Sequence, residues 1–208
     1  MPNWCFTKHA LLGPNDELKA FVGKIEEWTS KNCIDNGFFG KNWLGNIVLG
    51  AGLETVETVS DGIPCRGMLC EDWYLEDGQL WFDTQTAWGP MPEMWEKLVE
   101  MLAPHCTYHW LATEPGCGVF FKDDPDNLCF AGNDYFVNEF HEDENEPIIV
   151  RDEDDDDLVS EEFLEKKLRE YYDDSTSSLQ ELIARAEDEE FDGPNSFISI
   201  NKIESEIA

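Results

Sequence analysis

Seven cysteines and four histidines are the residues of this chain best suited to bind a metal or to act as nucleophile and base. On a strand, His105 and His109 share a face but stand about 13 Å apart, at about 3.3 Å per residue. One zinc ion cannot contact both at that separation, and Cys65 and Cys70 lack the spacing of a zinc site. We therefore expect no metal and no other cofactor, with cysteines buried as small apolar residues.

A catalytic cysteine is a second hypothesis, because three cysteines could each use a histidine as a base. The candidates are Cys5, Cys106 and Cys117, with His9, His105 and His109. Such a pair is identified by its arrangement in space, and the sequence has no local signature of a cysteine hydrolase. The residue types therefore favour a protein that is not an enzyme.

Glu114 begins the segment Glu-Pro-Gly-Cys-Gly, whose glycines permit close approach of a ligand to the backbone. Its carboxylate is a candidate binding group, and the alternative is a structural hydrogen bond to a neighbouring strand or indole. Four tryptophans could line a recognition groove beside it, since aromatic anchors concentrate binding energy. The alternative is that these rings fill the core. The four tryptophans are Trp4, Trp43, Trp88 and Trp110.

Acidic residues dominate the chain, with 46 Asp and Glu against 14 Lys and Arg and a formal net charge of -32. Residues 1–140 carry -14 and residues 141–208 carry -18, whereas all eight tryptophans lie in the first part. This charge repels nucleic-acid phosphates and anionic membranes, so we expect no direct binding to either. The expected partner is a basic protein surface, such as that of a nucleic-acid-binding or defence protein.

The acidic C-terminal third has three interpretations: a solubilising tail, a charged surface that attracts a basic protein, and a nucleic-acid mimic. A mimic needs carboxylates at fixed spacing, and helices over residues 160–172 and 178–186 could display Glu181, Glu187 and Asp188 among others. The candidate binding carboxylates are Asp154, Asp155, Asp156, Asp157, Glu161, Glu162 and Glu165.

The elements that position these residues follow from periodicity and turn residues. The sequence predicts strands over residues 4–12, 67–75, 79–88 and 106–113, helices that begin at Asn15 and near Pro92, and a short buried helix within 43–49. The order β, α, β, β, α, β is that of the ferredoxin-like sandwich, an α+β fold with both helices on one face. This order places residues 4–12 beside 106–113. Further short strands near 118–121, 128–131 and 135–140 would extend or edge the sheet.

We place a domain boundary near His141. Residues 1–140 form the ferredoxin-like domain, and residues 141–208 form an acidic, partly helical extension. Its helices are short enough to need the domain or a partner for stability. Apolar residues of the extension could dock on the sheet; they are Ile148, Ile149, Val150, Phe163, Leu164 and Leu168.

The start of the chain lacks a basic segment followed by an apolar one, and the longest apolar stretch, 43–53, is interrupted by Asn46 and glycines. We therefore expect no signal peptide and no membrane span. An odd number of cysteines without a CxxC pair is typical of reduced thiols. These features predict a cytoplasmic protein.

Four groups of short motifs form a set. Met1-Pro2-Asn3-Trp4-Cys5 opens the chain, Asn36-Gly37-Phe38 and Trp43-Leu44-Gly45 follow, then Thr86-Ala87-Trp88-Gly89-Pro90 and Glu114-Pro115-Gly116. Over roughly residues 1–140 this set resembles the YubB or Api-type ferredoxin-like family of phage, plasmid and other mobile-element proteins. The resemblance implies a fold and a genomic setting, without established catalytic residues. The acidic C-terminal third departs from the family pattern.

The main functional hypothesis is therefore a non-enzymatic acidic interaction protein of phage or mobile-element type that binds a basic protein. One alternative is a nucleic-acid mimic that inhibits a host DNA-binding or defence protein. The other is a small enzyme or nucleotide-ligand binder that uses the sheet face and the Glu114 loop.

Overall fold

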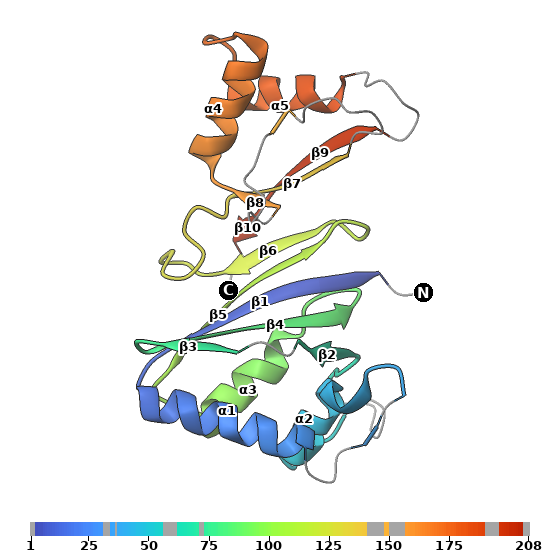
Figure 1. The fold of residues 1–208 in the computed structure, drawn as a ribbon, viewed down its shortest axis with the longest axis vertical. Helices are drawn as coiled ribbons and strands as arrows, with labels where there is room; N and C mark the ends of the chain where they lie inside the picture. The colour runs from blue at the N-terminus through green and yellow to red at the C-terminus, as the bar shows by residue number, and fades with distance from the viewer. Residues whose placement is uncertain are drawn as a thin grey trace. The chain divides into compact units, whose positions relative to one another are not determined.

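The structure is a computed structural model that describes residues 3–30, 34–35, 37–55, 62–70, 73–140, 148–149, 157–189 and 196–205. The chain divides into two compact units, Met1–Pro125 and Asp126–Ala208, and each contains helices and a sheet (Figure 1). Each unit also has a buried apolar core of its own. The expected α+β class is confirmed.

The first unit is built on an antiparallel sheet. Its elements are β1 (Trp4–Leu12), α1 (Asn15–Ser30), η1 (Gly40–Asn42), α2 (Leu44–Gly50), β2 (Gly67–Leu69), β3 (Tyr74–Glu76), β4 (Gln79–Ala87), α3 (Pro92–Leu102), β5 (Thr107–Glu114) and β6 (Val119–Asp123). Neighbouring strands follow the order β6-β5-β1-β4-β2, and β3 also pairs with β4. The predicted pairing of the first strand with residues 106–113 is confirmed, in a register that runs from Phe6 opposite Thr113 to Leu12 opposite Thr107.

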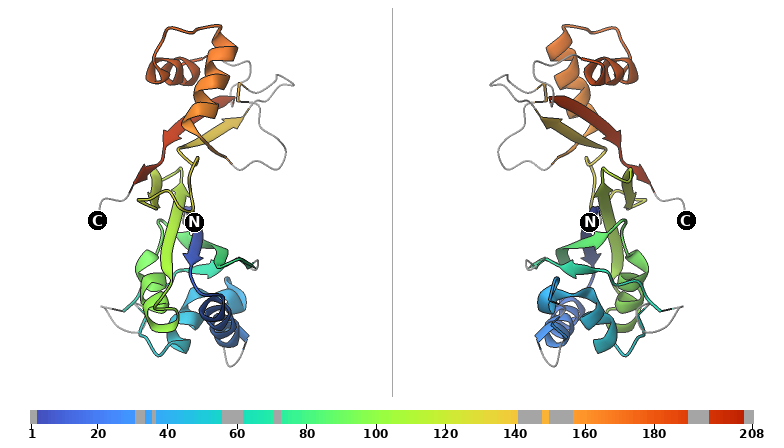
Figure 2. Two further views of the ribbon diagram at one scale, coloured as in Figure 1. Left: turned by 90° about the vertical axis from the view of Figure 1, so that its left-hand side faces the viewer. Right: turned by 90° about the vertical axis from the view of Figure 1, so that its right-hand side faces the viewer.

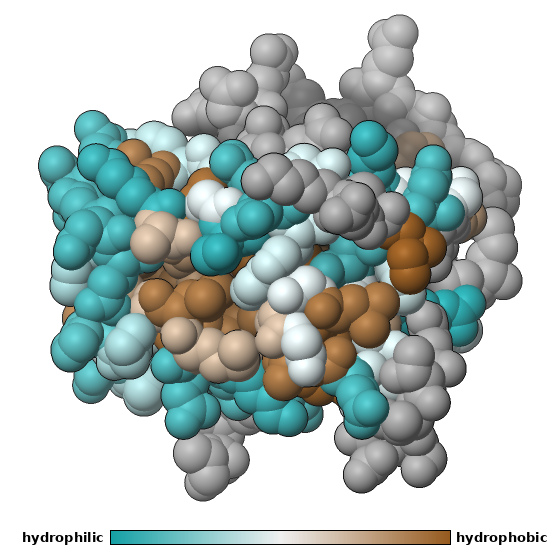
Figure 3. Space-filling model, turned by 90° about the horizontal axis from the view of Figure 1, so that it is seen from below, coloured by the Kyte–Doolittle hydropathy of each residue, from teal (hydrophilic) through white to brown (hydrophobic). Residues whose placement is uncertain are grey.

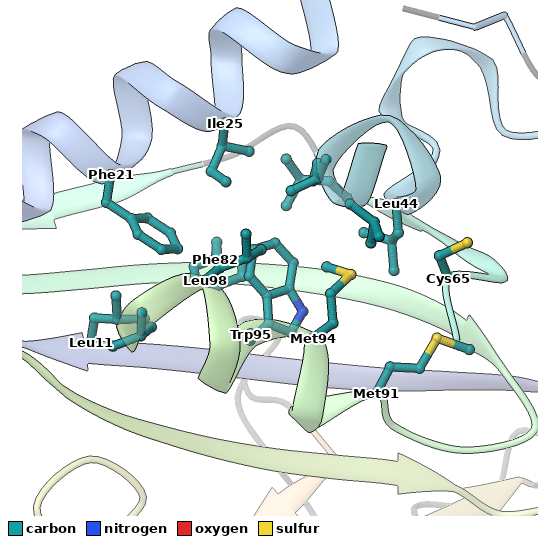
Figure 4. Packing of buried hydrophobic residues seen from close by; sticks show 14 of the residues in the cluster. Leu11, Phe21, Ile25, Leu44, Cys65, Phe82, Met91, Met94, Trp95 and Leu98 are labelled. Carbon is teal, nitrogen blue, oxygen red and sulfur yellow. The ribbon is translucent and has the colours of Figure 1, made fainter. Parts of the chain in front are cut away.

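Helices α1, α2 and α3 lie on one side of this sheet (Figures 1 and 2). Leu18, Phe21 and Ile25 recur at helical spacing on the buried side of α1, and Pro92 stands in the first turn of α3. Figure 4 shows Phe21 and Ile25 directed toward Trp95 of α3. The core is therefore a layer of apolar side chains between the helices and the sheet.

Some apolar side chains of the helical layer remain accessible. Leu49 and Met101 are 38% and 50% exposed, and Val22, Trp28 and Leu102 are partly buried against the core. Seen from the helical side, hydrophobic residues gather in the middle of the surface with hydrophilic residues around them (Figure 3).

Local turn chemistry accounts for the hairpin between β3 and β4. Asp77 and Gly78 have φ values of 47° and 82°, as the Asp-Gly step predicts for a tight hairpin turn. Two strand predictions differ from the structure. The strand expected over 67–75 is divided into β2 and β3, and residues 128–131 form bends and turns in place of a strand.

The second unit pairs three strands in the antiparallel order β8-β7-β9, with helices α4 and α5 packed on one face. Its elements are β7 (Tyr135–Phe140), β8 (Leu158–Val159), α4 (Glu161–Tyr172), α5 (Leu179–Glu187), β9 (Phe197–Lys202) and β10 (Glu204–Ser205). Both predicted helix starts are confirmed. The Ser160 side chain accepts the Phe163 N–H at 3.1 Å, and Ser178 and Glu181 form a capping box at α5.

This unit changes the expected domain organisation. The chain divides after Pro125, and not near His141, because β7 pairs with β8 and β9. Tyr135 and Val137 are buried with Leu164, Leu168 and other apolar residues of the C-terminal third, in a core that includes Ile148 and Ile149. Asp126–Ala208 is thus one compact α+β unit, and β7 does not extend the first sheet.

Among the described residues, no helix combines the length and the apolar character needed to cross a membrane. None of the described cysteines forms a disulfide.

Candidate functional site

Three of the sequence motifs meet at one corner of the first unit. We define this corner, the β1 corner, by Asn3, Cys5, Trp88, Glu114 and Cys117. The Trp88 N–H donates to the Asn3 carbonyl oxygen at 3.0 Å, and Asn3 Nδ2 lies 3.6 Å from Cys117 Sγ. The start of β1, the end of β4 and the end of β5 therefore come together because the antiparallel register places these three strand ends side by side.

Glu114 closes the turn that follows β5. Its carboxylate is buried, accepts the Gly116 N–H at 3.0 Å and also accepts the Cys117 N–H. A Cβ atom on Gly116 would lie 2.4 Å from Asn3 Nδ2 and 2.9 Å from Glu114 Oε1, so a side chain at this position would have to displace these polar groups. These contacts support the structural interpretation of Glu114, whose carboxylate stabilises the turn.

The two thiols of the β1 corner are held in the protonated form. Burial raises the pKa of Cys5 to about 11, although hydrogen bonds with Thr7 and Thr86 act in the opposite direction. A hydrogen bond with the Glu114 carboxylate is the main cause that raises the pKa of Cys117. A thiol acts as a nucleophile in its deprotonated form, so neither cysteine is activated at neutral pH.

His9, His105 and His109 form their polar contacts with hydroxyl groups and carboxylates. His9 is buried on the helix-covered face of the sheet, with Nδ1 2.8 Å from the Tyr108 hydroxyl and Nε2 2.9 Å from Thr84 Oγ1. Burial lowers its pKa to about 3, so the ring is neutral at physiological pH. His105 contacts Glu17 at 2.7 Å, and His109 Nδ1 lies 3.5 Å from an Asp124 carboxylate oxygen. None of these three rings is hydrogen-bonded to a cysteine in the described part of the chain.

The four tryptophans do not form one groove. Trp43 and Trp110 are 5% and 2% exposed, and both lie in the core of the first unit. For these two residues the groove prediction is wrong: Trp43 is packed beside Gly45, and Trp110 lies in the apolar cluster with Cys5 and Ala112.

The other two tryptophans remain at the surface. The Trp4 ring stacks on Phe38 with centroids 5.8 Å apart and meets Phe39 edge-on. Trp88 is 51% exposed and has a φ of 77°, a backbone conformation that bulky residues rarely adopt. Only Trp4 and Trp88 of the four are thus accessible to a partner.

Carboxylates organise the backbone of the second unit. Glu139 accepts the N–H groups of Ile148 and Ile149 at 2.5 and 3.0 Å, and Glu187 accepts that of Ile200 at 2.9 Å. The Asp174 carboxylate also accepts hydrogen bonds from the backbone and hydroxyl groups of Thr176 and Ser177. These hydrogen bonds lower the pKa of Asp174. Several acidic side chains therefore stabilise the folded backbone by hydrogen bonds in addition to contributing negative charge.

The candidate binding carboxylates on helix α4 differ from one another in their contacts. Glu165 is bound to Arg169, with Nη2 2.6 Å from Oε1, and Glu161 accepts the Tyr135 hydroxyl at 3.4 Å. Glu162 is exposed in the first turn of α4, where the helix dipole favours negative charge. Asp157 is exposed before β8, and Asp154, Asp155 and Asp156 lie outside the described residues.

Sequence reasoning missed β9 and the role of Glu187 beside it. The alternation of apolar and polar residues over Ile198, Ser199, Ile200 and Asn201 is the signal for this strand. No sequence pattern indicates that the Glu187 carboxylate contacts it, because that contact depends on how α5 packs on β9.

The second unit concentrates the charge of the protein. It holds 27 Asp and Glu against 6 Lys and Arg, a formal charge of -21, whereas the first unit carries -11. Comparison of the chain with protein-family models, with curated proteins and with solved structures found no match.

Proposed function

We propose that this chain is a non-enzymatic acidic interaction protein and that its second unit binds a basic surface of another protein. The observation that carries the proposal is a charge of -21 on a unit with a packed core of its own. Helices α4 and α5 hold part of these carboxylates at defined positions, and complementary charge accelerates encounter with a basic partner.

The strand order of the first unit supports the proposed fold and the resemblance to a known family. Its antiparallel order β5-β1-β4-β2, with α1 and α3 as connections, agrees with a ferredoxin-like sandwich. Together with the three motifs that meet at the β1 corner, this order supports membership of the YubB or Api-type family and a phage or mobile-element setting.

The chemistry of the β1 corner argues against the enzyme hypothesis. Raised pKa values keep Cys5 and Cys117 protonated, and the Glu114 carboxylate is bound to the backbone of its own turn. Because Glu114 is also buried, its carboxylate is poorly accessible to a small molecule. The β1 corner is therefore proposed as a structural feature.

The nucleic-acid mimic is the second candidate, and the helix surface supports it less well. A mimic of duplex DNA presents closely and regularly spaced negative charges. Helix α4 places Lys166, Lys167 and Arg169 among its carboxylates. Mixed charge of this kind favours a basic protein surface as the target over a site shaped for DNA.

Affinity capture with the full chain tests the proposal. The bait is compared with a variant of the second unit, Glu162→Gln with Asp173→Asn and Asp188→Asn, and with a matched variant of the first unit, Glu26→Gln with Asp77→Asn and Glu100→Gln. All six side chains are exposed, and both variants lose three negative charges. Capture from a bacterial lysate is quantified by mass spectrometry at about 50 and about 500 mM salt.

We expect a basic protein that is captured at low salt and released at high salt. The second-unit variant should bind it about tenfold more weakly, since each exposed charge contributes up to about 1 kcal/mol, and the matched variant should bind as the unaltered chain does. Equal losses in both variants, or capture that is insensitive to salt, would contradict the proposal. Release of the captured protein by duplex DNA would identify the mimic.

A further inference from the structure

Strand β9 forms an edge of the second unit's sheet. It pairs with β7 from Tyr135 opposite Lys202 to Phe140 opposite Phe197, and no described strand lies on its other side. In an antiparallel pair, the N–H and C=O groups of alternate residues point away from the partner strand. The N–H of Ile200 points outward, since it donates to a side chain of helix α5.

That side chain is Glu187, the last residue of α5. Its Oε1 atom lies 2.9 Å from the Ile200 nitrogen, at the place where the carbonyl oxygen of an added strand would accept this N–H. Glu187 is an exposed residue, so its carboxylate can exchange this contact for water or for a cation. Charged side chains at sheet edges are a common means of preventing unwanted strand pairing.

An aromatic pair stands at one end of the same edge. Phe140 and Phe197 lie directly opposite each other in the register, with ring centroids 6.3 Å apart. They are 49% and 43% exposed, on the sheet face opposite the packed Ile198 and Ile200 side chains. An apolar side chain of an added strand would find a contact surface there.

We propose that β9 accepts an extended, lysine- or arginine-bearing segment of the partner protein as an additional strand, with Glu187 acting as a guard that the cationic segment displaces. The Ile200 N–H then donates to a backbone carbonyl of the segment, and the Glu187 carboxylate pairs with one of its cationic side chains. Charge selects this occupant, because a second copy of this chain would bring another unit of charge -21 to the edge. This inference rests on the proposed function and gives it a binding mode, strand addition.

Two peptides of identical side chains test the inference on the full chain. One is a capped peptide of alternating lysine and valine, and the other has every backbone nitrogen methylated, which removes its donors and leaves its charge. Amide hydrogen exchange is followed at Ile198, Ile200 and Lys202. The unmethylated peptide should slow exchange at these amides about tenfold, and methylation should weaken binding about tenfold or more, since it removes the hydrogen bonds that the peptide backbone donates to β9.

The role of Glu187 as a guard of the Ile200 N–H is tested on the protein without peptide. Glu187→Ala should speed exchange of the Ile200 amide about tenfold relative to the unaltered chain, whereas the matched charge change Glu162→Ala should leave it unaltered. Glu187→Gln, which keeps an acceptor of the same length, should give an intermediate rate.

The outcomes separate this inference from the proposed function. Equal binding of both peptides that is lost at high salt would overturn strand addition while leaving the charge-driven function in place. Protection confined to other elements, or unchanged Ile200 exchange in Glu187→Ala, would also overturn it. Absence of binding by either peptide at low salt would count against both.

Discussion

His9 is a titratable side chain that serves as a core residue. Its ring stacks on Phe82 with centroids 4.7 Å apart, and both ring nitrogens contact hydroxyl groups, from Tyr108 and Thr84. Burial lowers its pKa to about 3, from an ordinary value of 6.5. The neutral ring therefore satisfies two buried hydroxyl groups, and protonation would bring an uncompensated charge into the core.

The sign of the resulting pH dependence is fixed by this shift. Above about pH 6.5 the ring is neutral in both states, and below it the unfolded chain binds a proton that the folded chain does not. We expect His9 to remove about 1 kcal/mol of unfolding free energy for each pH unit between about pH 6 and pH 4. Urea unfolding at several pH values, followed by tryptophan fluorescence, measures the slope.

The control is a comparison of two histidine variants. His9→Gln should flatten this slope relative to the unaltered protein, whereas His105→Gln, at an exposed position, should preserve it. Parallel slopes for all three proteins would mean that His9 is protonated in the folded state.

Helix α5 connects a local sequence signal to the core and to the sheet edge. Ser178 and Glu181 cap its start reciprocally, Leu182 and Ala186 are buried, and Glu187 reaches β9. The cap satisfies N–H groups that have no partner within the helix. The start of the helix thus fixes the direction in which the buried residues and Glu187 project.

Removal of this cap should loosen α5. Ser178→Ala is expected to cost about 1 kcal/mol, which would speed amide exchange of Leu182 and Ala186 about fivefold or more. Ser178→Thr keeps the hydroxyl group and should retain slow exchange. If the alanine variant exchanged as slowly as the unaltered chain, the capping box would not stabilise the helix.

The whole molecule carries a charge of -32, and its folded units bring like charges close together. Self-repulsion destabilises compact states, and salt screens it over a Debye length of about 8 Å at physiological ionic strength. We therefore expect the thermal midpoint to rise by about 5 °C between about 10 and about 500 mM NaCl, as measured by calorimetry. A midpoint that fell with salt would indicate that attractive ion pairs, such as Glu165 with Arg169, outweigh the repulsion.

The division of the chain also determines how a fragment behaves. A fragment that ends at Phe140 keeps β7 without β8 and β9, so it exposes an unpaired strand and the apolar side of Tyr135 and Val137. A fragment that ends at Pro125 lacks this strand. We expect the shorter fragment to unfold cooperatively on heating and the longer one to aggregate, and light scattering during the thermal scan distinguishes them. Equal solubility of both fragments would contradict this expectation.

Several local elements of this protein follow from the sequence alone. The Ser160 and Ser178 helix caps, the Asp77-Gly78 turn and the apolar stripes of α1 and α3 each depend on residues that are close together in the sequence. Their causes are short-range: side-chain hydrogen bonds to nearby N–H groups, backbone conformations that particular residues adopt, and a period of 3.6 residues. The pairing of β1 with β5 also followed from the sequence, because the element order β, α, β, β, α, β allows few arrangements of the strands.

Tertiary structure alone decided the features that depend on distant partners. Strand β7 pairs along its whole length with β9, some sixty residues further along the chain, and the short-range pattern of Tyr135–Phe140 suits either sheet. Whether a tryptophan is buried or exposed depends on which other elements pack over it. Trp110 is buried and Trp88 is exposed for this reason. The same holds for the carboxylates: a solvated acid and one bound to a backbone N–H look alike in sequence, and only folding brings Glu187 to Ile200. Strand pairing and burial are long-range properties, because their free energy comes from surfaces that meet after the chain has folded.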